Sequence, residues 1–304
     1  MDIKFKKIAG QVVSRHTSHC TNRRDAKANK TISSLGTERN YSQVLGQYFD
    51  WCDVNAVHPD YYANLQNLRL YLEERSEVVQ QKTLDLDRQA LSLVFHQKIH
   101  YVKSEKQTII HKRSYTQHQT VLIASHQSEK NAITTELAFY CGLRAHESAT
   151  ILPIEEQPTS KHREWDTRLF LGMPEHKVYS VIGKGGLIRA IAVPNQLSEK
   201  LETYRQLPQK NTDRGIFYST NYAIGFGQSW SQSFSDASVR AIGCSHGGHG
   251  LRHSFAKRRI SELPKAIELI TETANKATLR HEALKILSQE LGHFRVDITF
   301  CYLR

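Results

Sequence analysis

The stretch His249-Gly250-Leu251-Arg252-His253-Ser254-Phe255-Ala256 opens a helix that the sequence predicts to extend to Leu263. His249 and Arg252 are three residues apart, so their side chains share one face of that helix. The unpaired N–H groups of a helix N-terminus attract anions, and an arginine adds a permanent positive charge. The stretch therefore indicates an anion-binding site.

Three histidines in this region have spacings that suit a metal ion. His246, His249 and His253 are separated by three and four residues, but no carboxylate accompanies them. The five cysteines are scattered and include no Cys-x-x-Cys pair, which argues against a cysteine zinc site and a disulfide framework. We therefore predict no bound metal, no cofactor and a reducing, cytoplasmic environment.

Four further polar residues stand beside predicted breaks in the chain. They are Arg144 after the helix-ending Gly142, Lys184 in the turn Gly183-Lys184-Gly185-Gly186, His293 after Leu291-Gly292, and Tyr302. Each residue alone has an ordinary structural explanation, such as an arginine that caps a helix or a solvated lysine at a hairpin tip.

Together, these motifs in this order closely resemble the tyrosine recombinase (phage integrase) family. The motifs are Gly142-Leu143-Arg144-Ala145-His146-Glu147, Gly183-Lys184-Gly185-Gly186, the stretch from His249 to Ala256, Leu291-Gly292-His293, and Thr299 with Tyr302. The resemblance covers residues 128–302, and the nine residues from His293 to Tyr302 are the family's usual spacing. It implies six catalytic residues: Arg144, Lys184, His249, Arg252, His293 and Tyr302.

The resemblance also implies a reaction, in which Tyr302 attacks a DNA phosphodiester, forms a 3′-phosphotyrosyl link and releases a 5′-hydroxyl. A phenol is protonated at neutral pH, so it needs nearby positive charge and a proton acceptor. Arg144 and Arg252 would clamp the non-bridging oxygens, and Lys184 would protonate the leaving oxygen. His249 would bind the phosphate or accept the phenol proton, and the histidine of the Leu-Gly-His motif would donate a further hydrogen bond.

Three features lie outside this pattern or leave it open. The segment 262–279 lengthens the usual interval before His293 and is interpreted as an inserted loop and helix. Only Leu303 and Arg304 follow Tyr302, where the family usually carries a helix that docks on a neighbouring protomer, so the mode of assembly stays open. Glu147 either holds Arg144 through a charge-assisted hydrogen bond or is an ordinary surface carboxylate.

The composition agrees with a DNA partner. The chain has 304 residues, and 41 Lys and Arg against 30 Asp and Glu give it a net charge of +11. A surplus of this size favours a polyanionic partner such as double-stranded DNA. No apolar run reaches the roughly 18 residues of a membrane span, so we predict no membrane association.

The predicted fold class is mostly α with a small antiparallel β-sheet, an α+β arrangement. Residues 1–36 are interpreted as a basic N-terminal arm, residues 37–115 as a helical core-binding domain, and residues 121–304 as the catalytic domain. Within the helical domain, Thr37 and Thr83 are predicted to cap helices. In the catalytic domain, strands are predicted at 168–171, 177–182 and 187–193, and helices at 128–141, 145–152, 231–242, 249–263 and 281–291, with a short final helix that runs to Tyr302.

The leading function is a site-specific recombinase, an integrase of a mobile genetic element. A type IB topoisomerase would use the same residues as a monomer on any supercoiled DNA. A non-catalytic DNA-binding protein of the same fold is a third reading, which the intact set of six residues disfavours. Recombination of two duplexes needs four active sites, so we expect a monomer in solution and a tetramer on paired recombination sites. An accessory DNA-bending or directionality factor is a further expected partner.

Overall fold

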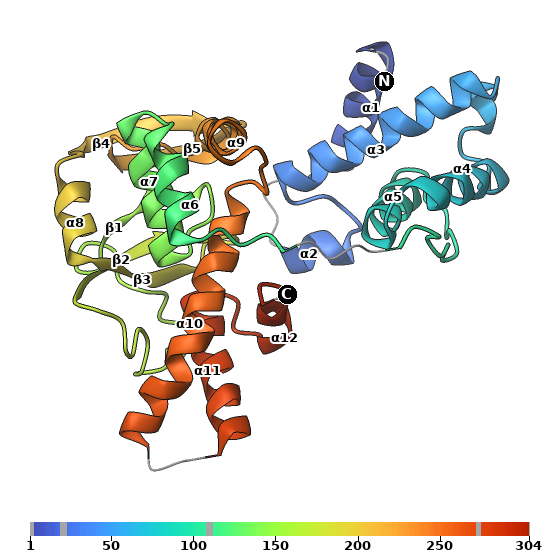
Figure 1. The fold of residues 1–304 in the computed structure, drawn as a ribbon. Helices are drawn as coiled ribbons and strands as arrows, with labels where there is room; N and C mark the ends of the chain where they lie inside the picture. The colour runs from blue at the N-terminus through green and yellow to red at the C-terminus, as the bar shows by residue number, and fades with distance from the viewer. Residues whose placement is uncertain (1–2, 19–22, 108–111, 272–274, 304) are drawn as a thin grey trace. The chain divides into compact units, whose positions relative to one another are not determined.

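The computed structural model describes residues 3–18, 23–107, 112–271 and 275–303 and divides the chain into two compact units, Met1–Ile110 and His111–Arg304 (Figure 1). The N-terminal unit is helical. Its helices are α1 (Ile3–Ser14), α2 (Arg23–Ala28), α3 (Leu35–Val54), α4 (Leu65–Val78) and α5 (Gln81–Val94), with a 3₁₀ turn at Pro59–Tyr61. None of the helices in the described ranges of either unit is long and apolar enough to cross a membrane.

Helix α3 supplies much of the core of the N-terminal unit, because its apolar residues recur on one face, as the sequence predicts. The Tyr48 ring lies 5.1 Å from the Tyr71 ring, and its hydroxyl donates a hydrogen bond of 2.8 Å to the carbonyl of Tyr62. The predicted caps were wrong. Ser34 caps α3 by accepting the N–H of Thr37, and α5 begins at Gln81, so Thr83 lies inside it.

The first part of the segment interpreted as a basic arm is a packed helix. Ala9 and Val13 of α1 are fully buried, and α1 packs against α3. Phe5, Ile8, Ala9, Val12 and Val13 recur at helical spacing, a signal that the many basic residues of this segment obscure. In the described residues, this segment therefore contributes to the core of the N-terminal unit.

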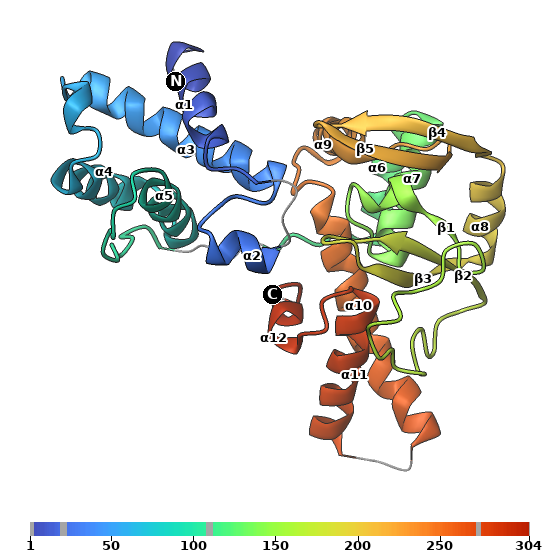
Figure 2. The ribbon, with the colours of Figure 1, turned by 180° about the vertical axis from the view of Figure 1, so that it is seen from behind.

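The C-terminal unit surrounds a small antiparallel sheet with helices (Figures 1 and 2), which confirms the predicted fold class. Strands β1 (Leu152–Pro153), β2 (His176–Ile182) and β3 (Ile188–Pro194) lie in the order β1-β2-β3, and β4 (Arg205–Asp213) pairs with β5 (Ile216–Tyr222) in a separate hairpin. The helices are α6 (Gln117–Ser125), α7 (Glu129–Cys141), α8 (Asn195–Glu202), α9 (Gly227–Ile242), α10 (His249–Ile270), α11 (Lys276–Glu290) and α12 (Val296–Phe300), with a 3₁₀ turn at Glu147–Thr150.

Among the described residues, the two larger of three apolar clusters hold most of this unit together. In the larger one, Leu137 of α7 and Trp230 of α9 pack with Val181 and Val193 of the sheet. The second joins α10 to α11, which lie side by side in both views. Helix α10 continues past Pro264 to Ile270, so the described part of segment 262–279 is the end of α10 and the start of α11 rather than an inserted loop.

The predicted strand at 168–171 is a turn. Phe170 has a φ of 64°, in the left-handed region, and its N–H donates to the Glu290 carboxylate at 3.0 Å. The Arg168 N–H donates to the Asp166 carboxylate at 2.9 Å. These side chains accept the hydrogen bonds that a strand would give to a neighbouring strand.

Candidate active site

The start of α10 and the chain that follows α11 meet at Tyr302, just beyond α12. The Tyr302 ring centroid lies 5.3 Å from that of His249, 4.9 Å from His253 and 5.1 Å from His293. The guanidinium carbon of Arg252 is 5.4 Å from the same centroid, and Tyr302 is only 8% exposed. Four of the six predicted site residues therefore form one cluster around a tyrosine.

Arg252 is fully buried in the first turn of α10. Its guanidinium donates hydrogen bonds to the carbonyl groups of Gly142 and Leu291 and to Nε2 of His293 at 3.2 Å. Burial and the positive charge of Arg144 lower the pKa of Arg252. Its Nε is buried and has no hydrogen-bond partner among the described residues, so this N–H remains able to donate to an anion.

His293 is held in its neutral form. Because its Nε2 accepts a hydrogen bond from Arg252, the ring proton lies on Nδ1. Burial and the charges of Arg252 and Arg144 lower the pKa of His293 to about 3. The Nδ1 atom is also buried without a partner in the described part of the chain. A neutral His293 can therefore donate one hydrogen bond from Nδ1.

His249 stands at the N-terminus of α10 with its side chain open to solvent. Partial burial of the ring and the charge of Arg252 lower the pKa of His249 to about 4. At neutral pH it is therefore an uncharged imidazole that can accept a proton beside the Tyr302 ring. His253, one turn further along, faces the carbonyl of Tyr302 through Nδ1 at 3.2 Å and helps to place this residue.

Arg144 is positioned by the end of α7 and by Glu147. Gly142 ends α7 with a φ of 62°, and a Cβ there would lie 2.7 Å from the Phe255 ring. The Glu147 carboxylate accepts the Arg144 N–H at 3.0 Å and its guanidinium at 2.6 Å. Glu147 is fully buried, which excludes a surface carboxylate and leaves the reading in which it holds Arg144.

Arg144 is linked to the cluster only through Glu147, whereas the structure gives Lys184 no link to the cluster among the described residues. Lys184 lies at the exposed tip of the β2–β3 hairpin and makes no hydrogen bond or ion pair with another described residue. The base of the hairpin is close to the site, because a Cβ on Gly183 would lie 3.3 Å from the Glu147 carboxylate and 3.8 Å from Arg144.

Two residues of this region belong to the surroundings of Tyr302 and Glu147 but are not predicted from the sequence as site residues. His253 was considered only as a metal ligand, although it contacts Tyr302. Arg189 is 1% exposed on β3 and donates to the Glu147 carboxylate at 2.7 Å. An arginine inside the apolar run Ile188-Arg189-Ala190-Ile191-Ala192-Val193 is the signal that could have identified it, because a buried charge requires a partner.

The described residues contain no group of three or more His, Cys, Asp or Glu side chains that could hold a metal ion. His246 instead donates its backbone N–H to the Tyr115 hydroxyl at 2.7 Å, and its ring lies 5.7 Å from the Tyr115 ring.

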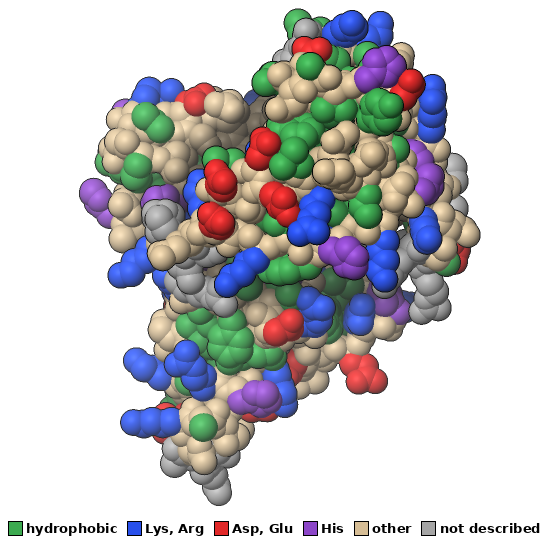
Figure 3. Space-filling model, turned by 90° about the vertical axis from the view of Figure 1, so that its right-hand side faces the viewer, with side chains coloured by type: hydrophobic (Ala, Val, Ile, Leu, Met, Phe, Trp, Pro, Cys, Tyr) green, Lys and Arg blue, Asp and Glu red, His purple; other side chains and the backbone are tan. Residues whose placement is uncertain are grey.

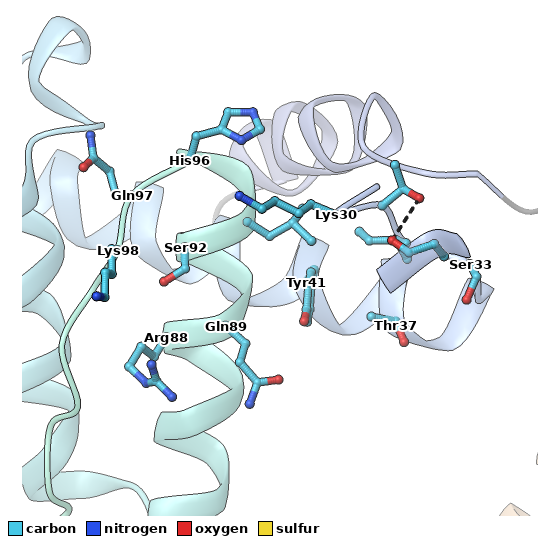
Figure 4. A pocket seen from close by; sticks show the side chains of 14 residues that line it. Lys30, Ser33, Thr37, Tyr41, Arg88, Gln89, Ser92, His96, Gln97 and Lys98 are labelled. Atoms are coloured by element: carbon cyan, nitrogen blue, oxygen red, sulfur yellow. Dashed lines mark hydrogen bonds between the residues drawn. The ribbon is translucent and has the colours of Figure 1, made fainter. Parts of the chain in front are cut away.

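A basic cavity of about 750 Å³ lies in the N-terminal unit, where the turn after α2 faces α3 and α5 (Figure 4). Lys30, Arg88, His96 and Lys98 line it together with hydroxyl and amide side chains, and none of the described residues that line it carries a carboxylate. Figure 4 shows Lys30 reaching toward the end of α5, where His96 lies. On the face drawn in Figure 3, Lys and Arg side chains are dispersed rather than gathered in one patch.

The comparisons with known proteins identify the fold. No family model and no curated protein matches the chain. Among solved structures, the XerH site-specific recombinase bound to palindromic difH substrate in a post-cleavage complex has a TM-score of 0.56 and 14% identity, over 99% of this chain and 90% of the other. The Tn1549 transposon integrase in complex with transposon right end DNA has a TM-score of 0.53 and 13% identity, over 97% of this chain and 94% of the other. This chain therefore has the tyrosine recombinase fold.

Proposed function

We propose that this protein is a site-specific DNA recombinase that cleaves and rejoins strands through a covalent bond to Tyr302. The observation that carries the proposal is the environment of Tyr302, whose phenol ring is contacted by Arg252 and by two neutral histidines. Two buried N–H donors near that phenol, Arg252 Nε and His293 Nδ1, lack partners among the described residues. Such donors are what a phosphate oxygen requires.

In this proposal the Tyr302 oxygen attacks phosphorus, and the bond from phosphorus to the 5′-oxygen breaks. The phenol proton passes to His249, whose lowered pKa keeps it neutral and ready to accept. Arg144 and Arg252 neutralise the charge that develops on the non-bridging oxygens. Lys184 gives a proton to the departing 5′-oxygen once bound DNA orders the hairpin tip. The phosphotyrosyl bond conserves the energy needed to rejoin strands.

The natural substrate in this proposal is double-stranded DNA that carries recombination sites, within the cytoplasm and as part of a mobile genetic element. The basic cavity of the N-terminal unit offers cationic groups to the DNA backbone. We propose a monomer that assembles as a tetramer only on paired sites, with an accessory DNA-bending or directionality factor. The XerH and Tn1549 structures are complexes with DNA, which supports a DNA partner here.

A covalent trapping experiment tests the nucleophile. A nicked DNA substrate loses the fragment beyond the cleavage point, so each cleaved strand stays attached to protein and migrates as an adduct. We expect the wild-type protein to form this adduct in excess chelator and Tyr302→Phe to form none, because the phenyl ring has no oxygen to attack phosphorus. DNA affinity should be unchanged in Tyr302→Phe.

The matched control is Tyr140→Phe, which removes a hydroxyl that accepts a hydrogen bond from Gln117 and lies outside the cluster. It should keep the adduct. An adduct formed by Tyr302→Phe would refute the assignment of the nucleophile. Relaxation of any supercoiled plasmid by a monomer would instead favour a type IB topoisomerase, and DNA binding without any adduct a non-catalytic protein.

A further inference from the structure

We propose that Arg189 is a positioning residue for strand cleavage, acting through Glu147 on the two arginines that bind the phosphate. The inference rests on the proposed function. Arg189 lies on β3, outside every motif of the predicted site, and it does not contact the Tyr302 ring. Its role follows from what its buried guanidinium holds in place.

Arg189 joins four segments that are far apart in the sequence. Its guanidinium donates to the Glu147 carboxylate at 2.7 Å, to the carbonyl of Glu290 at 2.6 Å and to the carbonyl of Gly142 at 3.3 Å. A Cβ on Gly292 would lie 2.8 Å from its Cδ atom, so the chain just before His293 packs directly on the Arg189 side chain. One side chain thus touches β3, the end of α7, the 3₁₀ turn and the end of α11.

Arg189 and Arg252 share this framework. Both donate to the carbonyl of Gly142, and they bind the adjacent carbonyls of Glu290 and Leu291. The two guanidinium groups therefore fix the same two chain ends from neighbouring positions.

The Glu147 carboxylate is the link to the phosphate-binding arginines. Its Oε1 accepts from Arg144 at 2.6 Å, while its Oε2 accepts from Arg189 at 2.7 Å and lies 3.9 Å from Arg252. Burial alone would raise the pKa of Glu147, but the charges of Arg189, Arg252 and Arg144 hold it well below its usual range. The carboxylate is therefore a fixed anion among three cations.

Each carboxylate oxygen holds a different arginine side chain, Oε1 that of Arg144 and Oε2 that of Arg189, while Oε2 also accepts the backbone N–H of Arg144 at 3.0 Å. Because Arg189 occupies Oε2, Oε1 remains directed at Arg144, and Arg252 remains bound to backbone carbonyls instead of moving onto Glu147. Without Arg189, Oε2 would keep only the backbone N–H of Arg144 at 3.0 Å, and this buried anionic oxygen would attract Arg252 from 3.9 Å away. Both arginines would then present their donors to the phosphate in altered positions.

A purely structural ion pair in the same unit provides the matched comparison. Arg259 and Glu290 are both fully buried and 2.8 Å apart, and the Arg259 guanidinium contacts none of the six predicted catalytic residues. Arg259→Met therefore removes a buried charge at the end of α11, next to the Glu290 carbonyl that Arg189 binds, while Glu147 keeps its contacts with Arg144 and Arg189. A role specific to Arg189 therefore requires that Arg189→Met lower the cleavage rate more than Arg259→Met does.

The test is a double-mutant cycle on single-turnover cleavage of the nicked substrate, with Arg189→Met, Glu147→Gln and the double variant. DNA affinity and thermal unfolding are measured for each. We expect Arg189→Met to lower the cleavage rate by about 10²-fold, the effect of a displacement near 1 Å in a reacting group, with DNA affinity within about twofold of wild type. Because Arg189 acts through Glu147, the double variant should cleave no more slowly than Glu147→Gln alone.

Arg189→Lys covers the case in which the methionine variant does not fold. Lysine keeps the charge, but it cannot reproduce the forked contacts to Glu147 and two carbonyls, so cleavage should remain impaired in a folded protein. Multiplicative losses in the double variant, or equal losses in Arg259→Met, would overturn the inference and leave Arg189 as a structural residue. Absence of any adduct with wild-type protein would overturn the proposed function, and this inference with it.

Discussion

The guanidinium of Arg252 shows how one residue can be both a structural and a chemical group. Backbone carbonyls of Gly142 and Leu291 and the ring of His293 orient its terminal nitrogens, which leaves Nε as the unpartnered donor among the described residues. The nearest carboxylate oxygen of Glu147 lies 3.9 Å from this guanidinium, so the buried cation is only partly compensated unless a further anion completes its environment. At this scale, the proposed phosphate site is a set of buried N–H donors that have no acceptor among the described residues.

At the same scale, His293 predicts a dependence of stability on pH. Its pKa is lowered to about 3 in the folded protein by burial and by Arg252, against about 6.5 for a free histidine. Between these pH values the unfolded chain binds one more proton, so the stabilisation is complete above about pH 6.5 and is lost as pH falls toward 3. We expect the free energy of unfolding to decline with a slope of at most about 1.4 kcal/mol per pH unit from this group, and less because the site is partly open to water.

Urea unfolding from pH 7 to pH 4.5 measures this slope. His293→Asn should make the decline shallower, because the titrating group is gone. His162→Asn, at an exposed histidine outside the cluster, is the control and should leave the slope as in wild type. Equal slopes in wild type and His293→Asn would contradict the buried, neutral state of this histidine.

Sequence motifs predicted the residues of the cluster better than its internal connections. The motifs from Arg144 to Tyr302 predict the candidate residues because each residue stands at a helix end or a turn, which short sequence patterns indicate. Burial of Glu147 and Arg189 depends on β3 lying beside the end of α7 and the end of α11, which is a long-range arrangement. No local pattern in a single sequence specifies such a contact.

At the scale of elements, the β2–β3 hairpin predicts how Lys184 acts. Gly185 and Gly186 have φ values of 81° and 80°, and Lys184 is exposed at this tip, so it can reach a leaving oxygen only when DNA is bound. A 5′-bridging sulfur leaves without a proton, because a thiolate is a far better leaving group than an alkoxide. Lys184→Ala should therefore cleave the sulfur substrate nearly as fast as wild type and the oxygen substrate about 10²–10⁴-fold more slowly.

Lys177→Ala, on the same hairpin but at the far end of β2, is the control and should be active on both substrates. Equal defects of Lys184→Ala on sulfur and oxygen would assign Lys184 to phosphate binding.

Periodicity also determined which elements could be predicted. The apolar stripe of α3 predicted that helix, since burial on one face leaves a clear period. The strand-like runs on either side of the glycine-rich turn predicted β2 and β3, although both strands are buried in continuous runs without alternation. Strand β4 is polar, contains Pro208 and has an irregular register between Arg205 and Gln209, so no alternation reveals it. The remaining sequence signal of the β4–β5 hairpin is the glycine of its turn Arg214-Gly215, where both residues have positive φ values, 47° and 74°.

At the scale of the whole molecule, the net charge of +11 predicts salt-dependent DNA binding, and we propose that the two units divide that task. The C-terminal unit holds the proposed cleavage site, where buried arginines contribute to rate more than to affinity. Affinity should come from accessible cations, among which Lys30 and Lys98 face one cavity without a carboxylate.

The cavity is tested by the variant Lys30→Glu/Lys98→Glu. Each phosphate contact contributes about 0.9 to the slope of log affinity against log salt, so loss of two contacts should reduce the slope by about 1.8. Lys82→Glu, an exposed lysine at the other end of α5 that does not line the cavity, controls for the change in net charge. Filter binding to one DNA duplex, from 50 to 200 mM salt, measures this slope for the wild type, the double variant and Lys82→Glu.

If the double variant and Lys82→Glu reduce the slope equally for each charge removed, the cavity does not contact DNA and binding depends on total charge alone. A reduced slope with an unchanged cleavage rate for bound DNA would separate the two units by function, with affinity in the first and chemistry in the second.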